Sequence, residues 1–255
     1  MRSADAVRHY GRVEDVTPAE RSAYAAVAAL ATDRPILDLG VGGGRTVMPL
    51  RAISEDYLGV DYSQPMIDTC RRRYPGVRFE LADARDLSGF APGSFALVVF
   101  SCNGLGMIDH EDRLRTLREV RRVLAADGRF VFSAHNQRCA DHTAGLVLPD
   151  LDLTWNALKL GVRLARFARD AASSVYNHRR LSKHDVRSPE YSIINDRCHH
   201  YATMLYYITL ANQRRQLVEC GFAPDAVAYD LAGQVITTDT VDSSIMYVAT
   251  RQGLR

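Results

Sequence analysis

The chain has 255 residues, of which 47% are hydrophobic and 24% are charged, and its net charge is only +2. This composition suits one large folded domain, or one domain with a substantial insertion, and excludes disordered, collagen-like and coiled-coil chains. No run approaches the ~18 apolar residues of a membrane-spanning helix, and the charged first twenty residues do not resemble a secretory signal. The five cysteines show no Cys-x-x-Cys spacing. We therefore expect a reduced, cytoplasmic protein without a membrane partner.

Strands and helices alternate through the first 134 residues. A helix is expected at 17–31, where Thr17, Pro18 and Glu20 form a typical helix start. Short apolar runs predict strands at 35–39, 57–60, 77–81, 95–100 and 129–133, with helices between them at 45–54, 63–74 and 110–125. The alternation predicts an α/β fold with a doubly wound, mostly parallel sheet. Ligands bind such sheets at the carboxyl ends of the strands.

Residues 136–200 interrupt the alternation over about ten times the usual length of a loop. Apolar residues at helical spacing predict a helix from about 153 to 176. Between Asn156 and Glu190, eight Lys and Arg side chains face three Asp and Glu side chains, which leaves a net charge of +5. A helix at 204–220 and strands at 225–231 and 244–250 are expected to complete the fold.

The turn after the first strand carries a glycine pattern, Asp38-x-Gly40-x-Gly42-x-Gly44. A glycine-rich turn between a strand and a helix binds anions or nucleotides. A dinucleotide fingerprint would need glycine or alanine where Arg45 stands, and a P-loop would need Gly-Lys-Ser/Thr. The spacing therefore excludes both of these classes.

The glycine pattern resembles the first motif of the class I AdoMet-dependent methyltransferases, which is an acidic residue followed by Gly-x-Gly-x-Gly. Further motifs agree in order: Gly59-Val-Asp61 through Met66, Ala82-Asp83-Ala84, and the helix, turn and strand of 117–132. The run 244–250 is similar to the last antiparallel strand of that family. The resemblance covers about 34–134 and 203–250, roughly 60% of the chain.

This resemblance implies a seven-stranded, mostly parallel sheet whose last strand is antiparallel, with an α-helical cap inserted after the fifth strand. Residues 1–134 and 203–255 are then the AdoMet-binding domain, and 135–202 are the cap. Aromatic residues in or beside the cap either line the acceptor pocket or form the cap's own core; they are Trp155, Tyr176, Tyr191, Tyr201, Tyr206 and Tyr207.

By the same resemblance, S-adenosyl-L-methionine (AdoMet) is the cofactor and S-adenosyl-L-homocysteine (AdoHcy) its product. Asp38 is expected beneath the methionine end of AdoMet, and Asp61 to accept hydrogen bonds from the ribose diol. Asp83 is expected to bind the adenine amino group and Met66 to pack on the ring. The full set of expected cofactor residues is Asp38, Gly40, Gly42, Gly44, Asp61, Tyr62, Met66, Asp83, Ala84, Ser101 and Asn103.

Four of these residues have an alternative role that is purely structural. Asp38 and Asp61 could cap helices, Asp83 could begin a turn, and Met66 could be ordinary core packing.

Methyl transfer from a sulfonium is an in-line displacement, so a base is needed only if the acceptor still holds its proton. His135 directly follows the fifth strand and is the predicted base, because imidazole titrates in the useful range. The alternative is a hydrogen-bonded structural histidine, and His110 is a weaker candidate. The expected acceptor is an oxygen or nitrogen of a small molecule, with oxygen slightly favoured by His135. The basic segment suits an anionic acceptor.

Metal and nucleic-acid chemistry are not expected. Magnesium-binding members of the family carry acidic residues after the fourth and fifth strands, whereas this chain has Ser101 and His135-Asn136 there. Enzymes that methylate exocyclic base nitrogens carry Asp/Asn-Pro-Pro-aromatic where this chain has Ser101-Cys-Asn-Gly104. The basic segment also lacks interleaved aromatics that would stack bases. Three alternatives stay open: an RNA or protein methyltransferase, a non-catalytic AdoMet-binding regulator, and a homo-oligomer formed through the cap.

Overall fold

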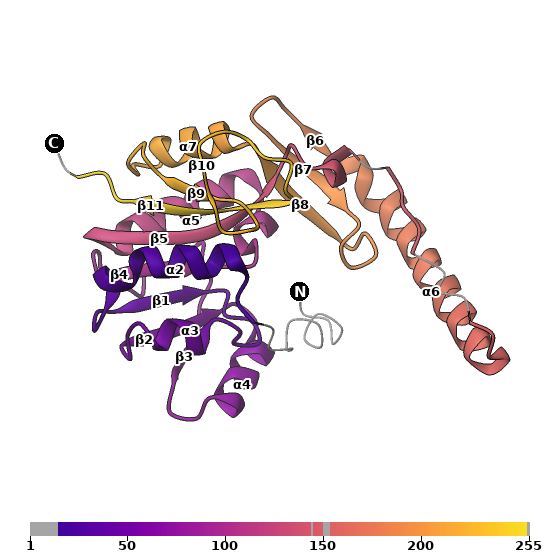
Figure 1. Cartoon of the computed structure of the whole chain (residues 1–255), viewed down its shortest axis with the longest axis horizontal. Helices are drawn as coiled ribbons and strands as arrows, with labels where there is room; N and C mark the ends of the chain where they lie inside the picture. Colours follow the sequence, from indigo (N-terminus) through magenta and orange to yellow (C-terminus); the bar gives the residue numbers. More distant parts are fainter. Residues whose placement is uncertain (1–14, 144, 150–153, 254–255) are drawn as a thin grey trace.

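The computed structural model describes residues 15–143, 145–149 and 154–253. Its centre is one sheet in the order β10-β9-β11-β5-β4-β1-β2-β3 (Figure 1). Strands β3, β2, β1, β4 and β5 are parallel neighbours, whereas β11 runs antiparallel to both β5 and β9. The strands of this path are β1 (Ile36–Leu39), β2 (Tyr57–Asp61), β3 (Arg78–Leu81), β4 (Phe95–Phe100), β5 (Leu124–Asn136), β9 (Val227–Tyr229), β10 (Val235–Ile236) and β11 (Ser244–Thr250). The predicted α/β class, with a mostly parallel sheet and an antiparallel last strand, is confirmed.

Helices cover both faces of this sheet, because its central strands are apolar on both sides. Every residue of β1 and β4 is buried, as is typical of strands inside a parallel sheet. Apolar side chains of α2 (Pro18–Ala31), α3 (Val47–Arg51) and α4 (Gln64–Arg73) pack on one face. Those of α5 (His110–Val123) and α7 (Leu210–Glu219) pack on the other. The predicted start of α2 is correct: Thr17 and Glu20 cap each other reciprocally.

The insertion after β5 contains strands as well as a helix. Its elements are η2 (Ala140–Thr143), α6 (Ala157–Leu181), η3 (Ser182–His184), β6 (Val186–Arg187), β7 (Tyr191–Asp196) and β8 (Thr203–Ile208). Strand β7 pairs antiparallel with β6 and β8, and β8 joins the main sheet beside β5. These additions and β10 bring the sheet to eleven strands, beyond the seven expected ones.

The helix expected at 204–220 is wrong over its first turn. Residues 203–208 form β8, because their β-branched and aromatic side chains fit a half-buried strand and β5 offers a free edge. The helix begins only after Thr209, whose hydroxyl accepts the N–H of Asn212.

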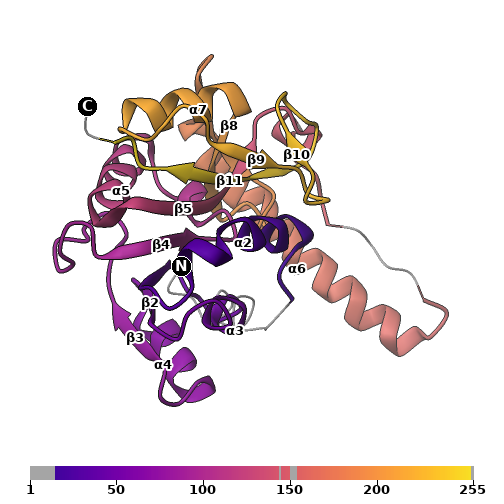
Figure 2. The ribbon, with the colours of Figure 1, turned by 60° about the vertical axis from the view of Figure 1, so that its left-hand side comes forward.

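Helix α6 is longer than expected and projects away from the body of the molecule (Figures 1 and 2). Its expected first residue, Leu153, lies outside the described residues. Among the residues that the structure describes, no helix is both long and apolar enough to cross a membrane.

Candidate active site

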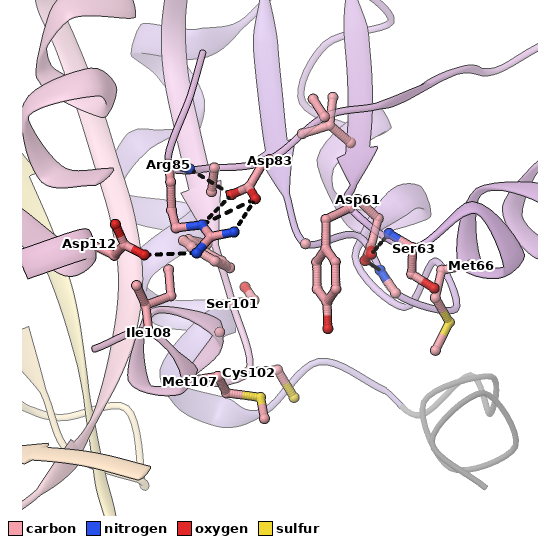
Figure 3. A pocket seen from close by; sticks show the side chains of 18 of the residues that line it. Asp61, Ser63, Met66, Asp83, Arg85, Ser101, Cys102, Met107, Ile108 and Asp112 are labelled. Carbon is pink, nitrogen blue, oxygen red and sulfur yellow. Dashed lines mark hydrogen bonds and ion pairs between the residues drawn. The ribbon is translucent and has the colours of Figure 1, made fainter. Parts of the chain in front are cut away.

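A pocket of about 410 Å³ opens at the carboxyl ends of β1, β2 and β4 and beside the segment that follows β3 (Figure 3). Most of the expected cofactor residues line it, namely Gly40, Gly42, Asp61, Tyr62, Met66, Asp83, Ala84 and Ser101. Asp38, Gly44, Asn103 and His135 are not among the lining residues. Further lining residues were not predicted: Val60, Ser63, Ala82, Arg85, Phe100, Cys102, Gly104, Met107, Ile108, Asp109, Asp112 and Thr203.

The glycine turn adopts a backbone shape that requires glycine. Gly40 and Gly44 have φ of +65° and +87°, the left-handed region that glycine enters at little cost. A Cβ on Gly40 would lie 2.9 Å from the Phe100 ring, and one on Gly44 would lie 2.6 Å from the Tyr74 ring. The turn is therefore packed between two aromatic rings, which hold its backbone at the pocket.

Asp38 lies beneath the turn rather than in the pocket. Its Oδ2 accepts hydrogen bonds from the hydroxyls of Thr46 (2.5 Å) and Tyr57 (2.7 Å), and its side chain is buried. Burial raises its pKa to about 6, although both hydrogen bonds act to lower it. Asp38 thus ties the segment after the glycine turn to β2.

Asp61 ends β2 and forms one wall of the pocket. Its Oδ2 accepts the N–H of Gly42 at 3.0 Å, and its Oδ1 accepts the N–H of Ser63 at 2.8 Å. Burial raises its pKa above the usual value, and the two backbone hydrogen bonds oppose that effect. Its carboxylate is therefore oriented from both sides before any ligand binds.

Asp83 is paired with a neighbour that the sequence did not single out. The guanidinium of Arg85 lies 2.7 Å from Asp83 and 2.7 Å from Asp112, so it joins the loop after β3 to the first turn of α5 (Figure 3). The Arg85 hydrogen bonds hold the pKa of Asp83 below its usual value. The carboxylate therefore stays ionised, and both of its oxygens already accept from Arg85.

The turn after β4 is strained at two successive residues. Cys102 and Asn103 have φ of +57° and +54°, a region that costs free energy for residues other than glycine and recurs at functional sites. The N–H of Asn103 donates to the Ser133 hydroxyl at 2.7 Å. Cys102 consequently faces the pocket, while the Asn103 side chain lies on the β5 side, beside His135.

The far wall of the pocket is the short helix η1 (Gly104–Met107), which the sequence did not predict. Arg113 holds it in place, because its buried guanidinium donates to the carbonyl of Leu105 at 2.8 Å. Met107 packs against Leu205 and the other apolar side chains of the β7–β8 hairpin. The insertion therefore reaches the pocket through this hairpin, and Thr203 is its lining residue.

Comparisons with known proteins agree on one family. A family model described as a methyltransferase domain matches residues 36–128. A demethylmenaquinone methyltransferase of Clavibacter sepedonicus is 38% identical over 109 residues, which are 42% of this chain and 42% of that protein. The matched stretches cover less than half the length of the first curated relatives. Residues 36–128 belong to the class I AdoMet-dependent methyltransferase family.

Solved structures extend the likeness of fold over nearly the whole chain. The CcbJ methyltransferase of Streptomyces caelestis has a TM-score of 0.61 at 20% identity, over 92% of this chain and 90% of that one. The 1,6-didemethyltoxoflavin-N1-methyltransferase of Burkholderia thailandensis has a TM-score of 0.56 at 14% identity, over 92% of this chain and 78% of that one. AdoMet is the cofactor of the family to which residues 36–128 belong, and the Burkholderia structure holds S-adenosylhomocysteine.

Helix α2 braces the two turns that border the pocket. Glu20 receives a bidentate pair of hydrogen bonds from Arg45, at 2.5 and 2.6 Å, just after the glycine turn. Burial alone would raise the pKa of Glu20, but the contacts with Arg45 more than offset it and leave the pKa lowered. The Tyr24 hydroxyl lies 2.8 Å from that of Ser101, after β4. A single helix thus fixes both turns.

His135, the predicted base, lies behind the pocket wall at the end of β5. Its Nδ1 is 3.5 Å from the side-chain amide nitrogen of Asn103, and its ring packs against Tyr207. Burial lowers its pKa to about 4, so the imidazole is neutral at physiological pH. His110 is placed elsewhere, stacked on Tyr191 and bonded to Tyr206.

The aromatic residues of the insertion do not line the described part of the pocket. Tyr191 and Tyr206 stack together, and Tyr207 donates to Asp196 at 2.5 Å. Tyr201 binds the segment at 145–147, while Trp155 and Tyr176 are exposed. Within the described ranges, no group of three or more His, Cys, Asp or Glu side chains is arranged to hold a metal ion.

Proposed function

We propose that the protein transfers the methyl group of AdoMet to an oxygen or nitrogen of a small-molecule acceptor. The observation that carries this proposal is the shape of the pocket. The glycine turn and Asp61 line the same pocket of about 410 Å³ as Cys102, Met107 and Thr203. Pockets of this size take small ligands, so the space beside a bound cofactor suits a compact acceptor.

The pocket supports a role for most of the expected cofactor residues. Asp61, already oriented by two backbone N–H groups, is proposed to accept hydrogen bonds from the ribose diol. Met66 is proposed to pack on the adenine ring and Asp83 to bind its amino group, with Arg85 fixing the carboxylate from the other side. Asp38 is proposed to act indirectly, by holding the turn that receives the methionine end.

The reaction requires little from the protein beyond positioning the acceptor and AdoMet. A lone pair of the acceptor attacks the methyl carbon, the carbon–sulfur bond breaks, and AdoHcy leaves with the electron pair of that bond. Holding the two reactants in line can supply roughly 7–11 kcal/mol of the barrier. Ser101 and Cys102 lie at the strained turn after β4, where the methyl group is expected.

His135 remains the proposed base for an acceptor that carries a proton. With a pKa of about 4 it is neutral and able to accept a proton, but it is a weak base. This low pKa weakens the preference for oxygen that His135 suggested, and acceptors with a free lone pair at neutral pH need no base. A ring nitrogen and a phenolate are two groups of that kind.

We also propose that residues 1–134 and 203–255 form the AdoMet-binding domain and that 135–202 form the cap. The pairing of β8 with both β5 and β7 ties the two parts together at this boundary. Thr203 is the residue of the hairpin that lines the pocket. The hairpin crosses the proposed boundary, with β7 in the cap and β8 in the AdoMet-binding domain, and it is the proposed acceptor-side element more than α6 is.

Similar proteins support a small-molecule acceptor. Two curated relatives are named for demethylmenaquinone, and one solved neighbour holds 1,6-didemethyltoxoflavin together with S-adenosylhomocysteine. The basic charge of α6 favours a second candidate, an RNA or protein methyltransferase that docks its substrate there. A non-catalytic AdoMet-binding regulator is the third.

The decisive experiment transfers labelled methyl from AdoMet into a size-fractionated host extract, with and without nuclease and protease. Label in the low-mass fraction supports the proposal, and Asp61→Ala should abolish it. Label in the large fraction that nuclease or protease releases would favour a macromolecular substrate instead. AdoHcy binding without transfer to any fraction would favour the regulator.

A further inference from the structure

Exposed apolar side chains gather on one arm of the molecule, formed by residues 145–149 and α6. Of the sixteen large apolar side chains that are exposed within the described residues, seven lie between residues 146 and 176; they are Leu146, Val147, Leu148, Trp155, Val162, Leu164 and Tyr176. Trp155, the sole tryptophan of the chain, is fully exposed just before α6 begins. Water-exposed apolar side chains in this density mark an interaction surface.

The arm is also strongly basic. Helix α6 carries six Lys and Arg side chains and a single acidic one, Asp170, whereas the whole chain has a net charge of only +2. At 100° per residue, Lys159, Arg163 and Arg166 share one side of the helix. Figures 1 and 2 show that α6 projects away from the body of the molecule.

An apolar stripe of α6 lies next to this basic side. Leu160, Leu164 and Phe167 each directly follow one of the three basic residues, so by the same spacing they lie about 100° further round the helix. Further along the helix, Ala171 and Val175 line one shallow pocket together with Leu148 of the neighbouring segment. The first half of the helix is left with a basic side and a partly open apolar side.

We propose that α6 is an interfacial helix that binds the surface of an anionic lipid bilayer. Helices of this kind combine a Lys- and Arg-rich side with Leu, Phe or Trp on the other, and they lie in the plane of the membrane. Tryptophan is enriched at the level of the headgroups, where Trp155 would lie. Anionic headgroups attract basic side chains that lie near the surface. The absence of a spanning helix among the described residues agrees with binding on the surface rather than across it.

Two other occupants fit the arm less well. A second copy would meet only the short apolar stripe of Leu160, Leu164 and Phe167, while a stable interface usually buries about 800 Å² on each partner. The same contact would bring two strongly basic helices together. An RNA would satisfy the charge, but it would leave the apolar stripe and Trp155 in water.

The full chain contains its own probe, because all tryptophan fluorescence comes from Trp155. Vesicles of equal parts phosphatidylglycerol and phosphatidylcholine should shift its emission to shorter wavelength, and brominated lipids should quench it. Vesicles of phosphatidylcholine alone should do neither. At ~1 M salt, where screening acts within about 3 Å, the shift should largely disappear. An unchanged emission with the anionic vesicles would overturn the proposal.

Two matched triple variants separate the effect of this surface from the effect of the protein's net charge. Lys159→Gln, Arg163→Gln and Arg166→Gln together should weaken vesicle binding at least tenfold. Arg21→Gln, Arg72→Gln and Arg118→Gln remove the same charge from exposed positions elsewhere and should leave binding unchanged. Circular dichroism checks that both variants are folded.

Three outcomes would overturn the proposal. Equal loss in both variants would mean attraction by net charge alone. A blue-shifted emission that grows with protein concentration without lipid would identify a second copy. A shift caused by RNA and not by vesicles would identify a nucleic acid. None of these readouts depends on methyl transfer.

Discussion

The main-chain N–H of Gly42 donates to Oδ2 of Asp61 at 3.0 Å, so the glycine turn after β1 and the end of β2 are joined by one hydrogen bond. The turn that is proposed to receive the methionine end of AdoMet and the residue that is proposed to bind its ribose are therefore fixed relative to each other. Figure 3 shows the Asp61 carboxylate beside Ser63 in the pocket lining.

Asp61→Ala should weaken AdoHcy binding at least tenfold, about 1.4 kcal/mol, because both the proposed ribose contacts and the bond to Gly42 are lost. Titration calorimetry measures this directly. Glu80→Ala, an exposed acidic position on the neighbouring β3, is the matched control and should bind normally. An unchanged affinity in folded Asp61→Ala would remove Asp61 from the cofactor site.

Gly40→Ala should abolish AdoHcy binding and lower the free energy of unfolding by about 1–3 kcal/mol, since alanine at φ +65° is strained and its Cβ would meet Phe100. Gly76→Ala is the control, because Gly76 has φ of +83° but nothing within 4 Å of an added Cβ. The Gly76→Ala variant should have a lower free energy of unfolding because of the backbone strain, and it should bind AdoHcy normally. If both variants bind AdoHcy normally, the shape of the turn is not what the cofactor requires.

Asp38→Asn should stabilise the protein above about pH 6. The folded pKa of Asp38, about 6, exceeds the ordinary value of 3.8, so ionisation of the buried carboxyl costs stability as the pH rises through 6. Asparagine keeps an oxygen for the hydroxyls of Thr46 and Tyr57 without the charge. Urea unfolding should show a gain on the order of 1–3 kcal/mol at about pH 8 that vanishes near pH 4. A loss of stability at about pH 8, where the wild-type carboxyl is ionised, would show that the charge itself is needed.

His135→Ala should lower turnover of an acceptor that carries a proton, while AdoHcy affinity stays nearly unchanged. Because burial lowers the pKa of His135 to about 4, wild-type activity that depends on it should be flat from pH 6 to 8 and fall only towards pH 4. The same depressed pKa means that its contribution to stability is present above about pH 6.5 and is lost as the pH falls towards 4. Full activity of the variant across this range would leave His135 with a structural role.

Local signals explain what the sequence could predict. The apolar runs of β1 to β5 and the glycine turn are each contained within a few residues, so their order predicted the sheet and a set of cofactor residues of which most line the pocket. Residues 203–208 were misread because a short apolar run fits a helix or a buried strand, and only the distant edge of β5 decides between them.

The remaining pocket residues depend on contacts between distant segments. Arg85 carries no motif, and its place follows from ion pairs with Asp83 and Asp112 on two different elements. Thr203 reaches the pocket only because β8 pairs with β5. Asp38 matched its motif, yet it faces Thr46 and Tyr57 beneath the turn, which a motif alone does not reveal.

The bracing by α2 joins the pocket to a part of the chain that the family's shared stretch does not include. That stretch begins at residue 36, after α2 has ended at Ala31. A fragment cut there would keep Arg45 and Ser101 but lose Glu20 and Tyr24, their partners. We therefore expect the two turns that border the pocket to be held less firmly in such a fragment than in the full chain.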